Sequence, residues 1–407
     1  MSSILGHEKP LKTLRTALGG DRMHHAWIFS GPVGVGKRTL AVELARILLD
    51  PSMDADQLGQ DDPVLATENG AMLAAGTHPD LHVIRKEDAA YSDNKQLRDR
   101  KQLNIPLDLL RERMIGGRTS DGKIKDAPAY RTASQGNGKI FIIDEAELLD
   151  RTAQNVLLKT LEEPPGGTTI ILVTSRPERL IATIRSRCQQ LPFGTLDIES
   201  MREWIDASDH EDEAGDRNWL LSWSEGSPGR YETAKRHELV QWVATLEPML
   251  AEADRGRFPP ELGATMVKLI DQYAEGELSE NTKGSKEAAN RAGVRALIRL
   301  LGHHLRNELV DSDDDRRTNG ICATIDLLAQ IEEESESHIN ISDHVGPFGA
   351  VLNEPEVIET NMSLVRACVD GIEPSPITTA ILTVEMCLHD SSHACGALQV
   401  SRQNLKR

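Results

Sequence analysis

The fold of this chain is decided by residues 27–39, WIFSGPVGVGKRT. The apolar run at 26–29 predicts a buried strand, and the amphipathic stretch at 40–48, LAVELARIL, predicts a helix soon after it. A glycine-rich segment joins the two. A strand, a glycine-rich loop and a helix in this order are typical of proteins that bind the phosphate groups of a nucleotide.

The loop contains Gly31, Gly34 and Gly36 and ends at Lys37, in the spacing G-x4-G-K. Glycine lets the backbone adopt a positive φ and approach a ligand closely, where a Cβ atom would clash. Backbone N–H groups of such a loop surround phosphate oxygens, and the N-terminus of the following helix adds partial positive charge. We therefore expect these four residues to bind the phosphates of ATP or ADP, with the lysine reaching the β- and γ-phosphates.

One position departs from the consensus of this loop. Arg38 follows the lysine at the place where a serine or threonine would bind Mg²⁺. The first hydroxyl comes one residue later, on Thr39, which a helix turns away by roughly 100°. We expect both residues to lie beside the nucleotide and the Mg²⁺ site to be weak. A loop that keeps its shape but binds no nucleotide is the alternative.

The composition restricts the class of protein. A length of 407 residues is sufficient for two or three domains. The formal net charge of −18 argues against a protein that coats nucleic acid over its whole surface, although it permits a local basic face. Aromatic residues make up only 3% of the chain, so nucleic-acid bases would find few side chains on which to stack.

The cysteines and the hydrophobic pattern indicate the compartment. The five cysteines are odd in number and include no C-x-x-C pair, which favours reduced thiols and no structural zinc. The N-terminus has no basic region followed by an apolar core, and no apolar run reaches the ~18 residues of a membrane span. We expect a cytoplasmic protein without a membrane partner.

A second set of candidate site residues follows a later apolar run. Residues 139–143, KIFII, predict a buried strand, and Asp144 and Glu145 come directly after it. In a nucleotide-binding sheet the first acid orients Mg²⁺ through water and the second polarises the attacking water. Acids after a strand also cap helices, so the pair is weak evidence alone. Its place downstream of Lys37, after a helical crossover, favours the catalytic interpretation.

Strands and helices continue to alternate up to residue 193. The sequence predicts a helix at 151–163, a core strand at 169–174 that ends at Ser175, and a long loop at 116–138. This alternation predicts an α/β fold, with a parallel sheet and helices on both of its faces.

Beyond residue 193 the pattern is helical only. We expect a nucleotide-binding domain over 1–193, a small helical lid domain over 194–237 and an all-helical domain over 238–407. Segments 115–138 and 205–216 have no assigned role. The predicted helices of the last domain lie at 236–252, 260–275, 285–308, 318–338, 355–371 and 375–388.

Four segments together carry a family resemblance. They are HAWIFSGPVGVGK at 25–37, DEA at 144–146, NVLLKTLEEPP at 155–165 and SRC at 186–188. This combination resembles the clamp-loader subunits of bacterial DNA polymerase III, which are AAA+ proteins. The resemblance is dense over 1–193 and extends to Arg230. It implies an AAA+ nucleotide-binding domain, a helical lid and a C-terminal collar through which subunits assemble.

The resemblance also implies roles for individual residues. Arg187, in the SRC segment, matches an arginine that reaches the ATP bound by the neighbouring subunit and so acts in trans. Ser175 matches a polar sensor at the tip of a strand, and Arg230 lies where a second sensor arginine is found. Pro228 and Gly229 before Arg230 depart from the pattern of the ATPase subunits. An ordinary surface arginine at a helix end is the alternative for Arg187.

Two departures favour a non-hydrolysing subunit over the catalytic gamma/tau type. Residues 50–138 contain no cysteine, so the four-cysteine zinc module that the gamma/tau type and many of the related subunits carry after the phosphate loop is missing. The more telling departure is Arg38, which displaces the Mg²⁺-binding hydroxyl. The resemblance implies gamma/tau and delta subunits as partners in a hetero-pentameric ring. Through that ring the chain would act on the sliding clamp and on primer–template DNA in replication.

The sequence is also consistent with two other functions. The chain could be a self-sufficient AAA+ ATPase, either of the gamma/tau type or a relative such as a branch-migration helicase. It could also be an adaptor whose nucleotide site is dead. Steady-state ATP turnover separates the first from a weakly hydrolysing subunit, and nucleotide binding separates the second.

Overall fold

The computed structural model describes most of the first 310 residues. The described residues are 4–20, 23–59, 68–99, 102–135, 137–208, 213–254, 259 and 261–310. The chain divides into two compact units, Met1–Arg236 and His237–Arg407. The first unit contains a mixed set of strands and helices, and the described part of the second unit is helical.

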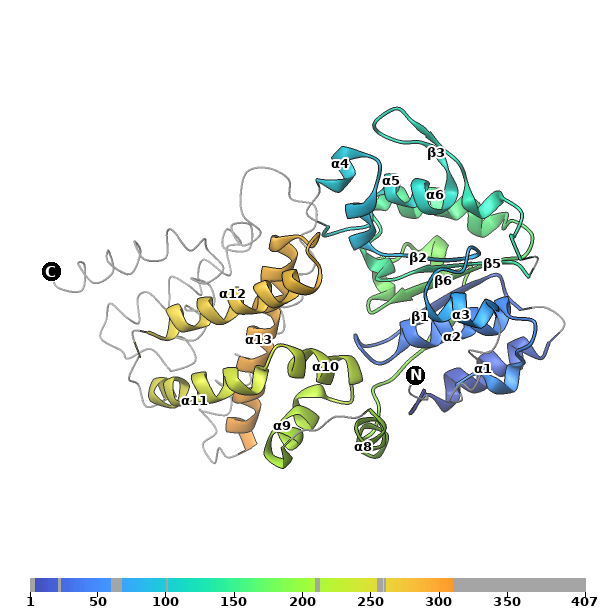
Figure 1. Ribbon diagram of the computed structural model, residues 1–407. Coiled ribbons are helices and arrows are strands. Elements are labelled where there is room, and N and C mark those ends of the chain that lie inside the picture. The colour runs from blue at the N-terminus through green and yellow to red at the C-terminus, as the bar shows by residue number, and fades with distance from the viewer. Residues whose placement is uncertain are drawn as a thin grey trace. The chain divides into compact units, whose positions relative to one another are not determined.

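A five-stranded sheet forms the centre of the first unit (Figure 1). Its spatial order is β2-β5-β6-β1-β7, and all neighbouring strands are parallel. The carboxyl ends of the strands therefore meet at one edge, where ligands bind in open α/β sheets. The strands are β1 (Ala26–Ser30), β2 (Leu81–Ile84), β5 (Lys139–Ile143), β6 (Thr168–Thr174) and β7 (Gln189–Pro192).

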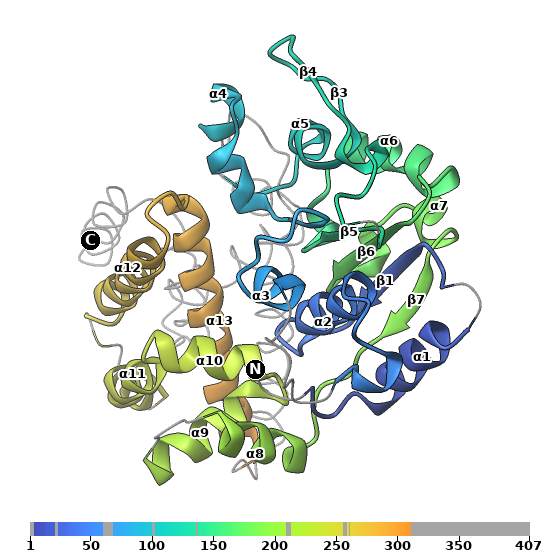
Figure 2. The same cartoon turned by 45° about the vertical axis from the view of Figure 1, so that its right-hand side comes forward.

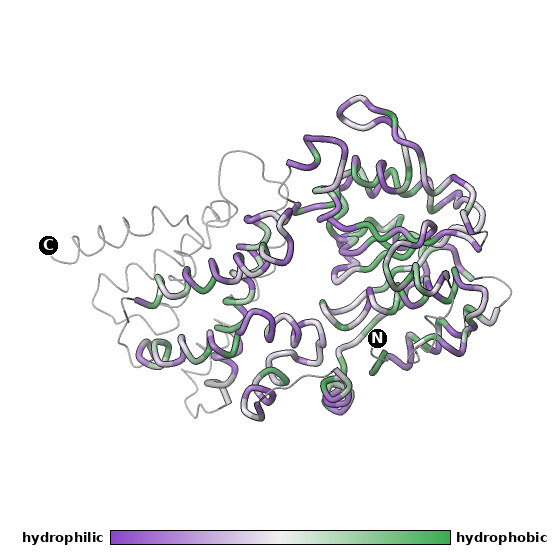
Figure 3. Tube along the Cα trace, in the orientation of Figure 1, coloured by the Kyte–Doolittle hydropathy of each residue, from purple (hydrophilic) through white to green (hydrophobic). Residues whose placement is uncertain are grey.

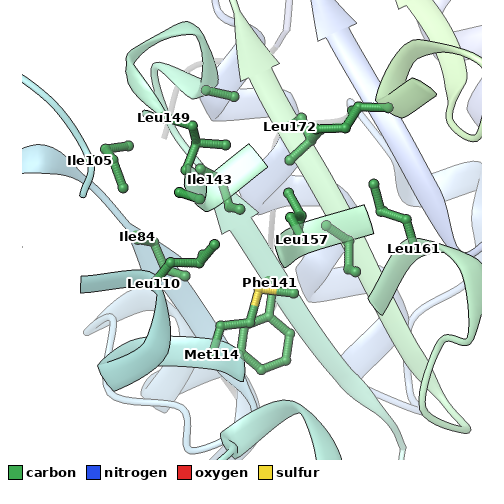
Figure 4. Packing of buried hydrophobic residues seen from close by; sticks show 14 of the residues in the cluster. Ile84, Ile105, Leu110, Met114, Phe141, Ile143, Leu149, Leu157, Leu161 and Leu172 are labelled. Atoms are coloured by element: carbon green, nitrogen blue, oxygen red, sulfur yellow. The ribbon is translucent and has the colours of Figure 1, made fainter. Parts of the chain in front are cut away.

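Helices cover both faces of this sheet. Adjacent residues of a strand point to opposite faces, so Phe141 belongs to one hydrophobic cluster and Ile142 to the other. Figure 3 shows hydrophobic residues concentrated along the strands, and Figure 4 shows the packing around Phe141. The first cluster includes residues of α5 (Leu107–Leu110), α6 (Arg151–Glu162) and α7 (Ala182–Arg185), and the second includes residues of α1 (Glu8–Leu18) and α2 (Lys37–Leu49).

The predicted α/β class is confirmed by this arrangement, but the sequence did not predict the edge strand β7 of this sheet. Strand β7, QQLP, has no apolar run, and it forms because its backbone pairs with β1, where Gln189 lies beside Trp27. An edge strand buries only part of its side chains, so its sequence carries a weak hydrophobic pattern.

The segment between β2 and β5 carries several short elements. Strands β3 (Gly117–Arg118) and β4 (Ile124–Lys125) pair antiparallel into a hairpin, which projects away from α2 in both Figure 1 and Figure 2. The sequence predicts only a loop here because strands of two residues leave no periodic pattern. The other elements are α4 (Lys95–Arg98), a π-helical turn at Arg111–Ile115 and 3₁₀ turns at Lys86–Tyr91 and Pro128–Tyr130.

Helices follow the sheet in the first unit and fill the described part of the second. Three predicted helices, at 236–252, 260–275 and 285–308, correspond to α11 (Leu239–Asp254), α12 (Leu262–Glu280) and α13 (Lys286–Val310). The helices predicted at 318–338, 355–371 and 375–388 lie outside the described residues. None of the described helices is long and apolar enough to cross a membrane. The remaining described helices are α3 (Glu68–Ala74), α8 (Ile198–Ala207), α9 (Ala214–Ser224) and α10 (Pro228–Arg236), with 3₁₀ turns at Ala55–Gln57, Ala146–Leu148 and Pro177–Arg179.

Candidate nucleotide-binding site

The glycine-rich loop connects the carboxyl end of β1 to the first residue of α2. Gly31, Gly34 and Gly36 have φ values of +148°, +78° and +98°, a region that residues with a Cβ rarely adopt. A Cβ on Gly31 would lie 2.3 Å from the carbonyl oxygen of Phe193. The loop therefore requires glycine for both its conformation and its packing, and it presents the N-terminus of α2 at the edge of the sheet.

Lys37 is buried beneath this loop. Its Nζ donates hydrogen bonds to the carbonyl oxygens of Gly31, at 2.6 Å, and Pro32, at 2.5 Å. Burial lowers the pKa of Lys37 to about 8, while the nearby Glu147 and Asp144 act in the opposite direction. The ammonium group is thus held against the inner side of the loop, the side from which a lysine reaches phosphate oxygens.

The two predicted acids lie at the same edge, and each is paired with a cation. Arg38 Nη1 lies 3.4 Å from Asp144 Oδ2. Lys86, which follows β2, places its Nζ 2.6 Å from Glu145 Oε2. Burial raises the pKa of Asp144, and the charge of Arg38 partly offsets that rise. Sequence reasoning missed Lys86, because only the pairing of β2 with β5 brings it beside Glu145.

Ser175 contacts an acid that sequence reasoning did not single out. Glu147 accepts hydrogen bonds from Ser175 Oγ at 2.6 Å and from its backbone N–H at 3.0 Å. Glu147 also raises the pKa of Lys37 through its charge, so the acid lies between the strand tip and the loop lysine. Its position three residues after Asp144 in the DEAE segment is the only sequence signal that could have identified it.

The start of α10 rests directly on the glycine-rich loop. Ser227 Oγ donates to the carbonyl oxygen of Val33 at 2.9 Å, and the Gly229 N–H donates to the carbonyl oxygen of Gly34 at 2.8 Å. The two backbones are so close that a Cβ on Gly229 would lie 2.7 Å from the Cα of Gly34. Arg230, on the same helix, pairs with Glu225 at 2.5 Å.

His7 supports the loop from its other side. Its Nε2 lies 2.6 Å from the carbonyl oxygen of Val35, and its ring packs edge-on against Phe193. Burial lowers the pKa of His7. A neutral imidazole can donate one ring N–H to that carbonyl, so this histidine positions the loop backbone. The sequence pattern contains no signal for this role, because the contact joins residues 28 positions apart.

Arg187 lies near the amino ends of the strands, whereas the glycine-rich loop lies at their carboxyl ends. It precedes β7, where Gln189 is level with Trp27, whereas the loop begins beyond Ser30. Arg187 Nη2 lies 2.7 Å from Glu162 Oε1, and its Nη1 donates to the carbonyl oxygen of Thr183 at 3.0 Å. The side chain is about one third exposed. From this position the Arg187 side chain cannot reach a nucleotide bound to the glycine-rich loop of its own chain.

The loop edge suits phosphate groups better than it suits Mg²⁺. Lys37, the glycine backbone and the N-terminus of α2 are ordinary phosphate donors. A magnesium ion needs oxygen ligands in near-octahedral geometry. Here Thr39 is exposed on α2, Asp144 is paired with Arg38, and Glu145 is paired with Lys86. A tightly held magnesium ion therefore does not fit the ligands that Thr39, Asp144 and Glu145 could offer.

Comparison with known proteins finds similarity in the N-terminal region. Residues 6–197 match the family model described as "DNA polymerase III, delta subunit". The chain is 32% identical over 244 residues to DNA polymerase III subunit delta' of Pseudomonas aeruginosa, covering 58% of this chain and 65% of that protein. It is 34% identical over 206 residues to subunit tau of Escherichia coli, covering 50% of this chain and 27% of that protein. The subunit delta' of Bacillus subtilis is 29% identical over 203 residues, covering 49% of this chain and 52% of that protein.

Solved structures with weaker similarity were also found. A gamma subunit-related protein of DNA polymerase III from Thermotoga maritima is 15% identical, with a TM-score of 0.36, covering 93% of this chain and 99% of that chain. The RuvB Holliday junction branch migration motor of Thermotoga maritima is 16% identical, with a TM-score of 0.32, covering 70% and 84%. The chain spans less than two thirds of the length of the curated relatives named above. Over residues 6–197 the chain is similar to the DNA polymerase III delta-subunit family.

Proposed function

We propose that this chain is a delta-prime-type subunit of a bacterial clamp loader. It binds ATP or ADP in its own loop with little or no hydrolysis, and it supplies Arg187 to the ATP of a neighbouring subunit. The observation that carries this proposal is the contrast between the two edges of the sheet. The acids beside the loop are paired with Arg38 and Lys86, whereas Arg187 stands at the edge remote from the loop.

The role of Arg187 follows from the chemistry of its side chain. A guanidinium is permanently charged and planar, and it can stabilise the charge that develops on a transferred γ-phosphoryl group. Cys188 is buried in the core cluster and holds the backbone beside Arg187 in place. The contact with Glu162 keeps the side chain in a defined position until a nucleotide on another subunit competes for it.

The partners of the chain are part of the same proposal. Curated relatives are named as delta' and tau subunits of DNA polymerase III, which supports a place among such subunits. We propose gamma/tau and delta subunits as neighbours in a hetero-pentameric ring. The helices from residue 238 onward would act as the collar that holds the ring together. The ring would place the sliding clamp on primer–template DNA, and the protein would work in the cytoplasm.

The test is a clamp-loading assay with a reconstituted complex in which every other subunit is wild type. Arg187→Ala should leave nucleotide binding by this chain unchanged and lower the clamp-loading rate at least about tenfold, since an arginine acting in trans is worth on the order of 10³–10⁵ at its site. Arg187→Lys should rescue poorly, because an ammonium lacks the guanidinium geometry. Arg151→Ala removes another exposed arginine, at the start of α6, and serves as the control.

Two results would contradict the proposal. Normal loading by the Arg187→Ala complex would reduce Arg187 to a surface residue. Failure of that complex to assemble would make it an interface anchor without a catalytic part. Size-exclusion chromatography of the mutant complex, run before the assay, separates the two results.

A further inference from the structure

Arg38 is paired with the carboxylate of Asp144, the group that would orient a hydrated magnesium ion. Its guanidinium Nη1 is 3.4 Å from Asp144 Oδ2, and Asp144 is mostly buried, with 17% of its side chain exposed. The arginine belongs to the first turn of α2, directly after the buried Lys37. A positive charge is therefore attached to the protein at the edge of the phosphate loop, beside the acid that would orient a hydrated metal ion.

The second acid is neutralised from another part of the chain. Lys86 Nζ lies 2.6 and 2.8 Å from the two carboxylate oxygens of Glu145, whose backbone has a φ of +51°. Both acids that follow β5 thus have a cationic partner. The edge of the sheet consequently repels a polyphosphate less than two unpaired carboxylates would, even without a divalent ion.

Arg38 can contact a phosphate without leaving Asp144. A guanidinium has five N–H donors, and the contact to Asp144 is made through Nη1. The Arg38 side chain is 54% exposed, so the other donors face outward at the start of α2. Guanidinium groups bind phosphate oxygens through paired, charge-assisted hydrogen bonds.

We infer that Arg38 takes the place of Mg²⁺, so that this chain binds a nucleoside di- or triphosphate without a divalent metal ion. Lys37 holds the phosphates from beneath the loop, and Arg38 supplies from the surface the charge that a metal would otherwise supply. The inference rests on the proposed nucleotide binding and adds its metal independence. A site of this kind retains nucleotide but lacks the ion that assists hydrolysis.

The test measures equilibrium binding of a fluorescent ADP analogue to the full chain, in buffer with Mg²⁺ and in buffer with excess EDTA. Wild type should give dissociation constants within about threefold of each other in the two buffers. Arg38→Thr should bind about tenfold or more weakly in EDTA, because a charged hydrogen-bond donor is lost, and Mg²⁺ should recover much of that loss. Arg38→Lys keeps the charge and should retain part of the EDTA binding.

Arg118→Thr is the matched control, because it removes an exposed arginine from the hairpin far from α2 and should not alter binding in either buffer. Wild-type binding that disappears in EDTA would overturn the inference, as would an Arg38→Thr variant with no metal dependence. A chain that binds no nucleotide in either buffer would also overturn it. That last result would not contradict the role proposed for Arg187 in trans, because the clamp-loading assay tests that role separately.

Discussion

Lys37 must satisfy two opposing requirements. It lies buried beneath the loop, where an ammonium group is poorly solvated, and it must be charged to hold a phosphate. Burial has brought its pKa to about 8, within reach of ordinary assay conditions. In the ligand-free protein the lysine is protonated below that pH and becomes neutral above it.

Nucleotide affinity should therefore fall as the pH rises through about 8. A lysine with its usual pKa of about 10.4 would show no loss until much higher pH. The measurement is the dissociation constant of a fluorescent ADP analogue from about pH 7 to about pH 9, with circular dichroism at each pH to show that the fold persists. A flat profile over that range would mean that Lys37 is not the group that holds the phosphates.

Glu162 provides a second prediction at the scale of single residues. Its ion pair with Arg187 is half exposed, so Glu162→Gln should change the free energy of unfolding by less than about 1 kcal/mol. If the ion pair only holds the Arg187 side chain when no neighbouring nucleotide is bound, a complex with Glu162→Gln should load clamps at the wild-type rate or faster. A loss of loading as large as that of Arg187→Ala would show instead that Glu162 orients the guanidinium.

At the scale of elements, α10 and the glycine-rich loop are joined through their backbones. Gly34 has a φ of +78°, and a Cβ there would lie 2.5 Å from Ser227 Oγ. Gly122, in the turn of the hairpin, has a similar φ of +83°, but a Cβ there would meet nothing within 4 Å. The two glycines therefore separate backbone strain from steric contact.

Both Gly→Ala changes should cost about 1–2 kcal/mol of stability through the left-handed backbone. Gly34→Ala should cost about 1–3 kcal/mol more, because the new methyl group displaces α10. It should also weaken nucleotide binding, whereas Gly122→Ala should not. Thermal melting and fluorescent ADP titration of both variants provide the test, and equal melting temperatures would show that α10 does not press on the loop.

At the scale of the whole molecule, the chain separates after Arg236 into two units. The first has its own core on both faces of the sheet and should fold alone. A fragment of residues 1–236 should melt cooperatively and bind nucleotide, yet fail to enter a reconstituted clamp loader. Co-purification with the other subunits provides the measurement. Normal assembly by the fragment would remove the proposed collar role from the rest of the chain.

The complete chain should also turn over ATP very slowly. The pairing of Arg38 with Asp144 and of Lys86 with Glu145 leaves the acids poorly placed to support hydrolysis. Steady-state phosphate release by the isolated protein, with and without primed DNA, provides the measurement. A rate of about one per second, within the ordinary range for enzymes, would favour a self-sufficient ATPase of the gamma/tau type.

Local sequence alone determined the strand–loop–helix unit at 26–49 and the apolar strands β5 and β6. Glycine spacing and continuous apolar runs are patterns of a few neighbouring residues, so they can be recognised without knowledge of the fold. The sequence also indicated Asp144 as a candidate site residue, because Asp144 directly follows such an apolar run. It contained little signal for β7, whose pairing with β1 compensates for its polar composition.

Only the tertiary structure decided which groups meet at the loop. Arg38 reaches Asp144 across 106 positions, Lys86 reaches Glu145 across 59, and Ser227 reaches Val33 across 194. Each contact depends on the order of the strands and on the direction of a side chain. Hydrophobic periodicity specifies which face of an element is buried, but it does not specify which element lies beside it. The sheet order β2-β5-β6-β1-β7 supplies that information, and with it the pairing of both acids.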